Sequence, residues 1–119
     1  MPSLLDLADK MPQRQAHLAS KLPAVMQRFQ SLKQAIEEGE HISAKQKALI
    51  ALAVAVAKQC EYCLAVHVKA AWEAGASEAE ILEACSVAIL MGGGPAVAYT
   101  TLVAEALDEL RAQKGGDAQ

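Results

Sequence analysis

The sequence predicts an all-α protein, a compact bundle of five or six helices. No stretch shows the apolar–polar alternation typical of a half-buried strand. Ala occurs 25 times among 119 residues, aromatic residues make up only 3% of the chain, and Leu, Glu, Lys and Gln fill most other positions. These residue types favour helices that pack closely through small side chains, while the few Gly and Pro residues fall at expected helix boundaries.

The N-terminal segment is expected to form an arm or cover. Residues 1–20 contain short helical patterns, which Pro12 is expected to break. Pro23 is well suited to the first position of a helix, and apolar residues at helical spacing extend that helix to about residue 38.

A long apolar segment follows. Ser43, with Gln46 three residues later, forms a capping box, so the next helix begins at 43 or 44. Residues 48–57 are ten consecutive apolar residues. This run is too short to cross a bilayer, which takes about 20 residues. We therefore expect it to be central in the fold or shared between subunits.

The interval 44–74 is long for one helix, because globular helices usually run to about 8–20 residues. We expect a break near Lys58 or Gln59, which would place Cys60 at a helix N-terminus. A second capping box, Ser77 with Glu80, predicts a helix over about 77–91.

The Gly-rich stretch at 92–94 is expected to be an interhelical turn, since it lacks the Lys-Ser or Lys-Thr pair and the preceding strand of a phosphate-binding loop. Pro95 then starts a last helix that continues to about Arg111. The expected organisation is a single domain over 1–119, with the arm at 1–20, a helical core over 23–111 and a flexible tail over 112–119.

The charge of the chain argues against two classes of partner. A net charge of −3 gives no electrostatic reason to bind nucleic acid or an anionic membrane. The N-terminus lacks a basic region followed by a long apolar run, so neither a secretory signal nor a membrane span is predicted. We expect a cytoplasmic protein. In that reducing setting a close Cys pair is more often redox-active or metal-binding than structural.

The stretch CEYCLAVH carries the candidate chemistry. On a helix, Cys60, Cys63 and His67 share one face, because offsets of zero, three and seven residues return to within roughly 60° of one another. A helix N-terminus stabilises a thiolate and can lower a cysteine pKa from about 8.5 to roughly 3.5–7.5. The imidazole can accept or deliver a proton. The three residues are therefore candidates for nucleophilic thiol catalysis.

Three other interpretations of these residues are a haem attachment site, a zinc site and simple core packing. Haem attachment requires His directly after the second Cys, where this chain has Leu64. Zinc could take Cys60, Cys63 and His67 as ligands, but a structural site needs a fourth, and no second CxxC or HxxxH is nearby. In the third interpretation, the same residues are simply small, buried members of an Ala-rich helix. No metal or cofactor is expected.

Residues 43–99, with the CxxCxxxH core and the GAS and MGGGPA turns, resemble the carboxymuconolactone decarboxylase and alkylhydroperoxidase D family. The resemblance implies an all-helical fold and a trimeric or hexameric homo-oligomer. In the redox branch it implies that Cys63 attacks a hydroperoxide, that Cys60 resolves the sulfenic acid as a disulfide, and that His67 relays protons. A separate dithiol then reduces the disulfide.

One departure from the redox branch concerns the relay. That branch usually carries Glu twelve residues before the first Cys, where this chain has Ala48. Glu61 or Glu83 are candidates to replace it in space. Some members have His immediately before the second Cys, where this chain has Tyr62.

The sequence therefore predicts a thiol-dependent peroxidase or disulfide reductase for antioxidant defence. The alternatives are a lactone-acting enzyme of the decarboxylase branch, which generally lacks the paired cysteines, and a non-enzymatic thiol sensor or scaffold. Cys85 is expected to be a buried core residue, and His17 and His41 solvated surface residues. Core or interface packing is also expected for the aromatic residues, although they could line the approach to the thiols: Tyr62, Trp72 and Tyr99.

Overall fold

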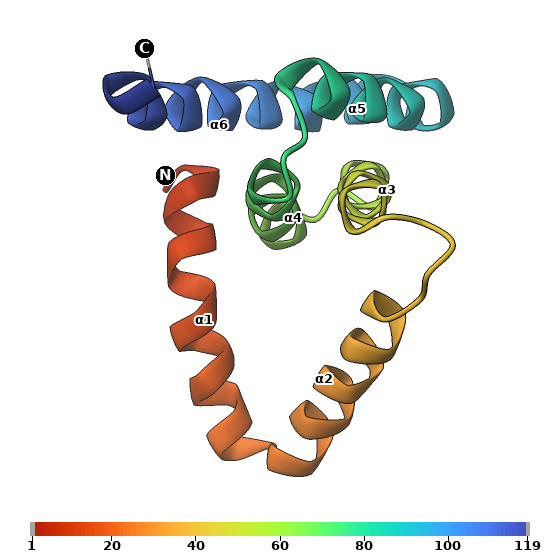
Figure 1. The fold of residues 1–119 in the computed structure, drawn as a ribbon, viewed down its shortest axis with the longest axis vertical. Helices are drawn as coiled ribbons and strands as arrows, with labels where there is room; N and C mark the ends of the chain where they lie inside the picture. The colour runs from red at the N-terminus through yellow and green to blue at the C-terminus, as the bar shows by residue number, and fades with distance from the viewer. Residues whose placement is uncertain (1, 119) are drawn as a thin grey trace.

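The computed structural model describes residues 2–118, and over that range it contains six α-helices and no strand (Figure 1). The all-α prediction is confirmed. The helices are α1 (Leu4–Lys21), α2 (Pro23–Glu37), α3 (Ala44–Ala57), α4 (Glu61–Glu73), α5 (Glu78–Gly92) and α6 (Gly94–Ala118).

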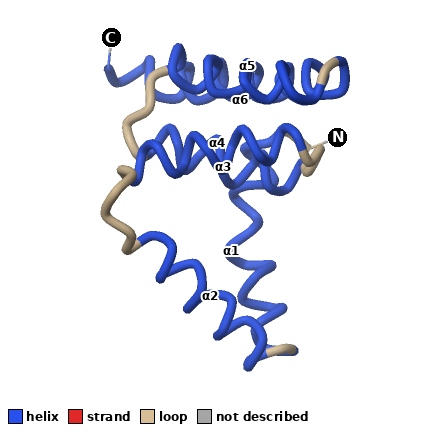
Figure 2. The backbone as a smooth tube through the Cα atoms, turned by 90° about the vertical axis from the view of Figure 1, so that its right-hand side faces the viewer, coloured by secondary structure: helices blue, strands red, loops and turns tan. Residues whose placement is uncertain are grey.

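The helices form two layers and a projecting hairpin. Helices α5 and α6 lie side by side in one layer, and α3 and α4 lie side by side in the next (Figures 1 and 2). Helices α1 and α2 extend from the second layer as a V (Figure 1). Helix α1 packs against α4 and also contacts α6. The two layers, together with the start of α1, therefore enclose the core.

The core is made of small and medium apolar side chains. No polar or charged residue is buried among the residues whose side chains are described, 2–114. A fully buried Leu or Val contributes roughly 1.5–3 kcal/mol relative to an exposed one. The largest fully buried side chains come from the four helices of the two layers: Leu52, Val56, Leu64, Val68, Ile81, Cys85, Val103 and Leu107.

The apolar run of α3 is central on one face only. Leu52 and Val56 are completely buried, whereas Ile50 and Val54 are 51% and 50% exposed. The expected central position is therefore observed for the inner face. Sharing of the outer face between subunits stays a prediction.

Helix α1 differs from the expected broken arm, because it continues through Pro12 without interruption. A proline inside a helix removes one backbone hydrogen bond and can cost about 3 kcal/mol. Packing opposes that cost: the first two turns of α1 bury four residues in the core, and Lys69 of α4 binds Asp9 at 3.0 Å. The residues buried by α1 are Leu4, Leu5, Leu7 and Ala8. The N-terminal segment is thus part of the core at its start and an exposed arm only beyond it.

Helix α2 forms where expected, but it buries none of its residues. Four large apolar side chains on one face of the helix are each more than half exposed: Val25, Phe29, Leu32 and Ile36. We call these four residues the α2 stripe. The end of the helix is held by Lys47 of α3, whose Nζ donates to the carbonyl oxygens of Ile36 at 2.9 Å and Gly39 at 2.7 Å.

The two predicted capping boxes and the Gly-rich turn are confirmed. Ser43 and Ser77 cap α3 and α5 as predicted, and Gly93, with φ of 69°, separates α5 from α6. Helix α6 continues to Ala118 rather than ending near Arg111. Flexibility of the tail over 112–119 stays a prediction, and Gln119 lies outside the described residues.

The break between α3 and α4 occurs where the sequence predicted it, and Gln59 makes it. Gln59 has φ of 58°, the left-handed conformation that non-Gly residues rarely adopt. The amide of Gln59 donates to Val56 O at 3.1 Å, and the amide of Cys60 donates to Ala55 O at 3.2 Å. This pair of bonds is a Schellman motif, which terminates α3 and directs the chain into α4.

We predict that residue 59 controls stability through its backbone conformation. Non-Gly residues in left-handed conformations cost roughly 1–3 kcal/mol. Gln59→Gly should raise the free energy of unfolding by about 0.5–1 kcal/mol, and Gln59→Val should lower it by about 1 kcal/mol or more, because a β-branched residue is least tolerant of positive φ. Urea unfolding of the oxidised protein measures both. A Val variant as stable as the wild type would contradict the assigned conformation.

Candidate functional site

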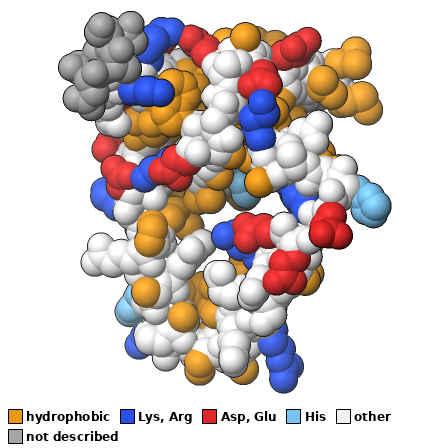
Figure 3. All heavy atoms as spheres, in the orientation of Figure 1, with side chains coloured by type: hydrophobic (Ala, Val, Ile, Leu, Met, Phe, Trp, Pro, Cys, Tyr) orange, Lys and Arg blue, Asp and Glu red, His pale blue; other side chains and the backbone are white. Residues whose placement is uncertain are grey.

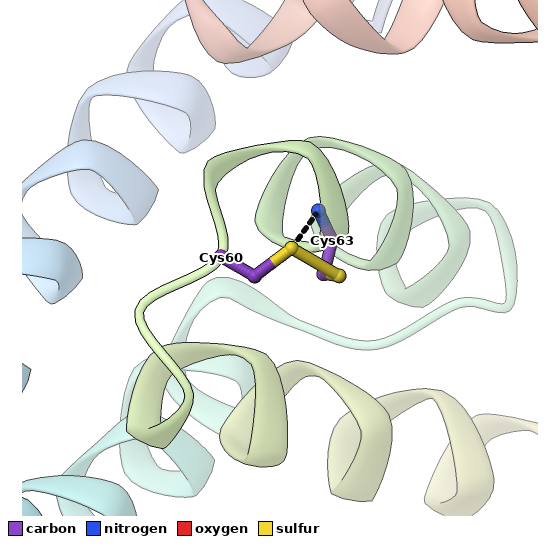
Figure 4. The surroundings of a disulfide bond; sticks show 2 residues. All are labelled: Cys60 and Cys63. Atoms are coloured by element: carbon purple, nitrogen blue, oxygen red, sulfur yellow. Dashed lines mark hydrogen bonds between the residues drawn. A yellow bond between two sulfur atoms is a disulfide. The ribbon is translucent and has the colours of Figure 1, made fainter.

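Cys60 and Cys63 form a disulfide at the N-terminus of α4, with their Cα atoms 5.2 Å apart (Figure 4). Cys60 is the N-cap residue of α4, and its Sγ accepts a hydrogen bond from the Cys63 amide at 3.1 Å. The capping position usually belongs to an oxygen-bearing side chain. Here a sulfur takes that role, and the expected position of Cys60 at a helix N-terminus is confirmed.

The two sulfur-bearing residues differ in their access to solvent. Cys60 is partly buried and Cys63 is exposed. Leu64 and Ala65, which follow Cys63 in the chain, are completely buried and fix this end of α4 on the core. The pair is therefore attached to a rigid helix while Cys63 remains open to solvent. The interpretation of all three residues as simple core packing does not fit Cys63.

His67 lies on α4 one turn after Cys63 and is partly buried. Burial lowers the pKa of its imidazole, and the positive charge of Lys33 on α2 lowers that pKa further. Both effects favour the neutral imidazole, which is the form able to accept a proton. No hydrogen bond from His67 to either sulfur occurs in the described part of the chain, so its place in a proton relay stays a prediction.

Two cationic side chains from the N-terminal hairpin act on this end of α4. Arg14 of α1 approaches Tyr62, with Nη1 3.5 Å from the phenol oxygen and Cζ 6.0 Å from the ring centroid. Lys33 of α2 acts on His67 through its charge. Sequence reasoning missed both residues. They precede Cys60 by 46 and 27 positions (60 − 14 and 60 − 33), and no motif connects them to it.

Position 48 and the two glutamates that are candidates to replace its carboxylate lie in different parts of the fold. Ala48 is partly buried on α3 and packs against the core. Glu61 is exposed in the first turn of α4, next to Cys60. Glu83 lies on α5 and lines an open hollow with Lys45 of α3, away from both cysteines. Of the two glutamates, Glu61 is therefore the one next to the disulfide in the sequence.

The third cysteine, the other two histidines and the aromatic residues lie in the core or on the surface of the fold. Cys85 is completely buried, and burial raises the pKa of its thiol to about 11. His17 and His41 are exposed. The core assignment of Cys85 and the surface assignment of both histidines are confirmed. Trp72 and Tyr99 are partly buried against the core, whereas Tyr62 is 50% exposed.

Two open hollows lie on the surface of the described residues, one between α1 and α2 and one between α3 and α5. An open hollow of about 450 Å³ lies between α1 and α2, lined by residues that include Ala19, Met26 and Gln30. Figure 3, in the orientation of Figure 1, shows an opening between the hairpin and the helices above it. Within the described residues, no three His, Cys, Asp or Glu side chains gather as metal ligands. Across residues 2–118, no helix has the length and apolar character needed to span a membrane.

A six-helix fold with a CxxC disulfide at a helix N-terminus defines the class of this protein as an all-α domain with a paired-thiol site. The model of the carboxymuconolactone decarboxylase family matches residues 23–106. The chain belongs to that family, and the resemblance noted from the sequence is confirmed.

Known proteins agree with this assignment. The crystal structure of apo-lpg0406, a carboxymuconolactone decarboxylase family protein from Legionella pneumophila, superposes with a TM-score of 0.81 at 35% sequence identity, over 87% of this chain and 92% of that one. An uncharacterized protein of Cupriavidus necator is 34% identical over 95 residues, 80% of this chain and 84% of its own length. An uncharacterized protein in the cox locus of Paracoccus denitrificans is 37% identical over 82 residues, 69% of this chain and 74% of its own.

We predict that Lys33 helps to keep His67 neutral. In Lys33→Gln the nearby positive charge is lost, so the pKa of His67 should rise toward its ordinary value, and the imidazole should become protonated at a higher pH than in the wild type. NMR titration of the imidazole protons measures this shift. Lys33→Arg keeps the charge and should leave the titration unchanged. A Lys33→Gln titration identical to the wild type would show that burial alone sets the pKa.

Proposed function

We propose that this protein is a thiol-dependent peroxidase or disulfide reductase of the alkylhydroperoxidase D type, acting in antioxidant defence in the cytoplasm. The observation that carries the proposal is the disulfide between Cys60 and Cys63 at the start of α4, with Cys63 exposed. Two cysteines that can bond to each other beside solvent can be oxidised and reduced without unfolding of the core. Membership of the family supports the same chemistry.

The reaction needs no metal or cofactor. The Cys63 thiolate attacks the terminal oxygen of a hydroperoxide, the O–O bond breaks, and the alcohol leaves with a proton, giving a sulfenic acid. The Cys60 thiolate then attacks the sulfenic sulfur, the S–O bond breaks, hydroxide leaves and takes a proton from solvent to become water, and the disulfide forms. A separate dithiol reduces this disulfide and becomes oxidised itself.

His67 is the proposed proton carrier. Its neutral imidazole can take the proton of the Cys63 thiol and deliver it to the departing oxygen. Because the base must be unprotonated, the rate of the peroxide reaction should fall as pH falls through the lowered pKa of His67. The site therefore needs His67 in the neutral state that burial and Lys33 favour.

We predict that peroxide oxidises the reduced protein with the loss of two hydrogens, and that Cys63→Ser abolishes this mass change. Cys85 is a built-in control, since its buried thiol should be alkylated only after unfolding. Mass spectrometry after treatment with peroxide and then with an alkylating reagent measures both effects. An unchanged number of free thiols in the peroxide-treated wild type would contradict the proposal.

The non-enzymatic thiol sensor is the second candidate, and Ala48 is the observation that favours it, because the redox branch usually has Glu at that position. Steady-state peroxide consumption with a dithiol reductant separates the two functions. Measurable turnover by the wild type supports the peroxidase. Turnover that appears only in Ala48→Glu supports the sensor, with Ala48→Gln as the uncharged control.

The proposal includes a homo-oligomer, a trimer or a hexamer, in which the α2 stripe is covered by a second copy. An isolated helix of about 15 residues is marginal in water, so α2 needs more burial than α1 alone provides. The stripe residues are 51–59% exposed, and α2 buries no residue within the chain. Contact with another copy would remove these side chains from water.

We predict that the stripe sets the oligomeric state. The wild type should have a solution mass of three or six times 12.6 kDa, and Phe29→Asp or Leu32→Glu should shift it toward 12.6 kDa. Ser31→Glu, on another face of α2, is the matched control and should keep the larger mass. Light scattering coupled to size-exclusion chromatography measures the mass. A monomeric wild type at tens of micromolar would contradict this part of the proposal.

A further inference from the structure

The two sulfurs of the disulfide have different surroundings, and the difference bears on which one a reductant attacks. Cys60 is partly buried, and its Sγ accepts the Cys63 amide at 3.1 Å (Figure 4). Cys63 is exposed, one residue after the half-exposed Tyr62. One sulfur is therefore held by the helix backbone, and the other belongs to a residue that solvent reaches.

Disulfide exchange is governed by these two properties. The attacking thiolate needs access to one sulfur, and the bond breaks faster when the other sulfur is the more stable thiolate. Access favours attack on Cys63. Stabilisation favours departure of Cys60, because an anion at an N-cap receives a backbone hydrogen bond and the partial positive charge of the helix N-terminus. Both properties therefore favour attack on Cys63 with Cys60 as the leaving thiolate.

We propose that the reductant attacks Sγ of Cys63 and expels Cys60, so that the mixed disulfide with the partner forms at Cys63. This inference rests on the proposed function of the pair. The thiolate of the reductant forms a new S–S bond with Cys63, the Cys60–Cys63 bond breaks, and its electron pair stays on Cys60 as the thiolate. No net oxidation occurs in this step.

The second thiol of a dithiol reductant completes the reaction. It attacks its own partner sulfur in the mixed disulfide, closes the oxidised reductant and releases Cys63 as a thiolate. Hydroperoxide and reductant thus both react at the exposed Cys63. Cys60 alternates between a thiolate at the N-cap and a sulfur bonded to Cys63. The exposed carboxylate of Glu61 opposes the Cys60 anion, but water screens it, whereas the Cys63 amide is in direct contact.

The direction of attack is tested on oxidised wild-type protein with 2-mercaptoethanol, a small neutral thiol. A brief reaction is stopped with acid, and free thiols are blocked with N-ethylmaleimide under mildly acidic conditions. Tandem mass spectrometry of the peptide containing both cysteines then locates the two labels. We expect mercaptoethanol on Cys63 and maleimide on Cys60, in excess of the reverse arrangement by on the order of tenfold. Equal amounts, or an excess of the reverse arrangement, would overturn the inference.

Single-cysteine variants test the reason for that direction. Cys60→Ser keeps an oxygen acceptor at the N-cap, so α4 should retain its start, and circular dichroism checks this. Thiolate absorbance should persist to lower pH in Cys63→Ser, which retains Cys60, than in Cys60→Ser, which retains Cys63. The opposite order would remove the proposed stabilisation of the leaving sulfur.

These results are distinguishable from a failure of the proposed function. Mercaptoethanol found mainly on Cys60 of a protein that consumes peroxide would overturn the direction of attack and leave the proposed peroxidase intact. Mercaptoethanol found mainly on Cys63 of a protein that consumes no peroxide would support the direction of attack and count against the peroxidase.

Discussion

The junction between α3 and α4 is the constraint on which the rest of this structure depends. Gln59 in a left-handed conformation ends α3, and the next residue, Cys60, begins α4 as its N-cap. If the chain continued as one helix, Cys60 could not accept the Cys63 amide from a capping position, and α4 could not fold back beside α3. One backbone conformation therefore creates both the helix pair that carries the core and the position of the thiols.

The stability of this arrangement comes from small side chains in close contact. Ala65 and Ala71 on α4 are completely buried, as is Cys85 on α5, so helices approach closely and the disulfide end of α4 is supported from behind. Dense packing of this kind resists movement, since interiors pack about as tightly as organic crystals. In the proposed function, a redox change at the surface of α4 would leave this packing in place. Cys63 is thus exposed on a helix whose inner face is closely packed.

The electrostatic surroundings of the site differ from those implied by the resemblance to the redox branch. That branch supplies a carboxylate to the histidine relay, whereas here Ala48 holds the equivalent position and the charge acting on His67 is the cation Lys33. A carboxylate would favour the protonated imidazole, while burial and a neighbouring cation favour the neutral one. The helix that bears the disulfide therefore also carries an imidazole whose neutral form is favoured, and the neutral form is the one that can accept a proton.

The sequence alone determined the helical content, the capping boxes at Ser43 and Ser77, the break before Cys60 and the family. Each of these follows from residues close together in the chain, because caps, turns and periodicity act over a few positions. Only the tertiary structure decided that α1 continues through Pro12, that α2 lies uncovered, and that Lys33 acts on His67. Those outcomes depend on packing between segments far apart in the sequence, where burial outweighs local preference. Local rules therefore placed the two cysteines at a helix start, and the assembled helices decided that Cys63 is exposed and Cys60 is partly covered.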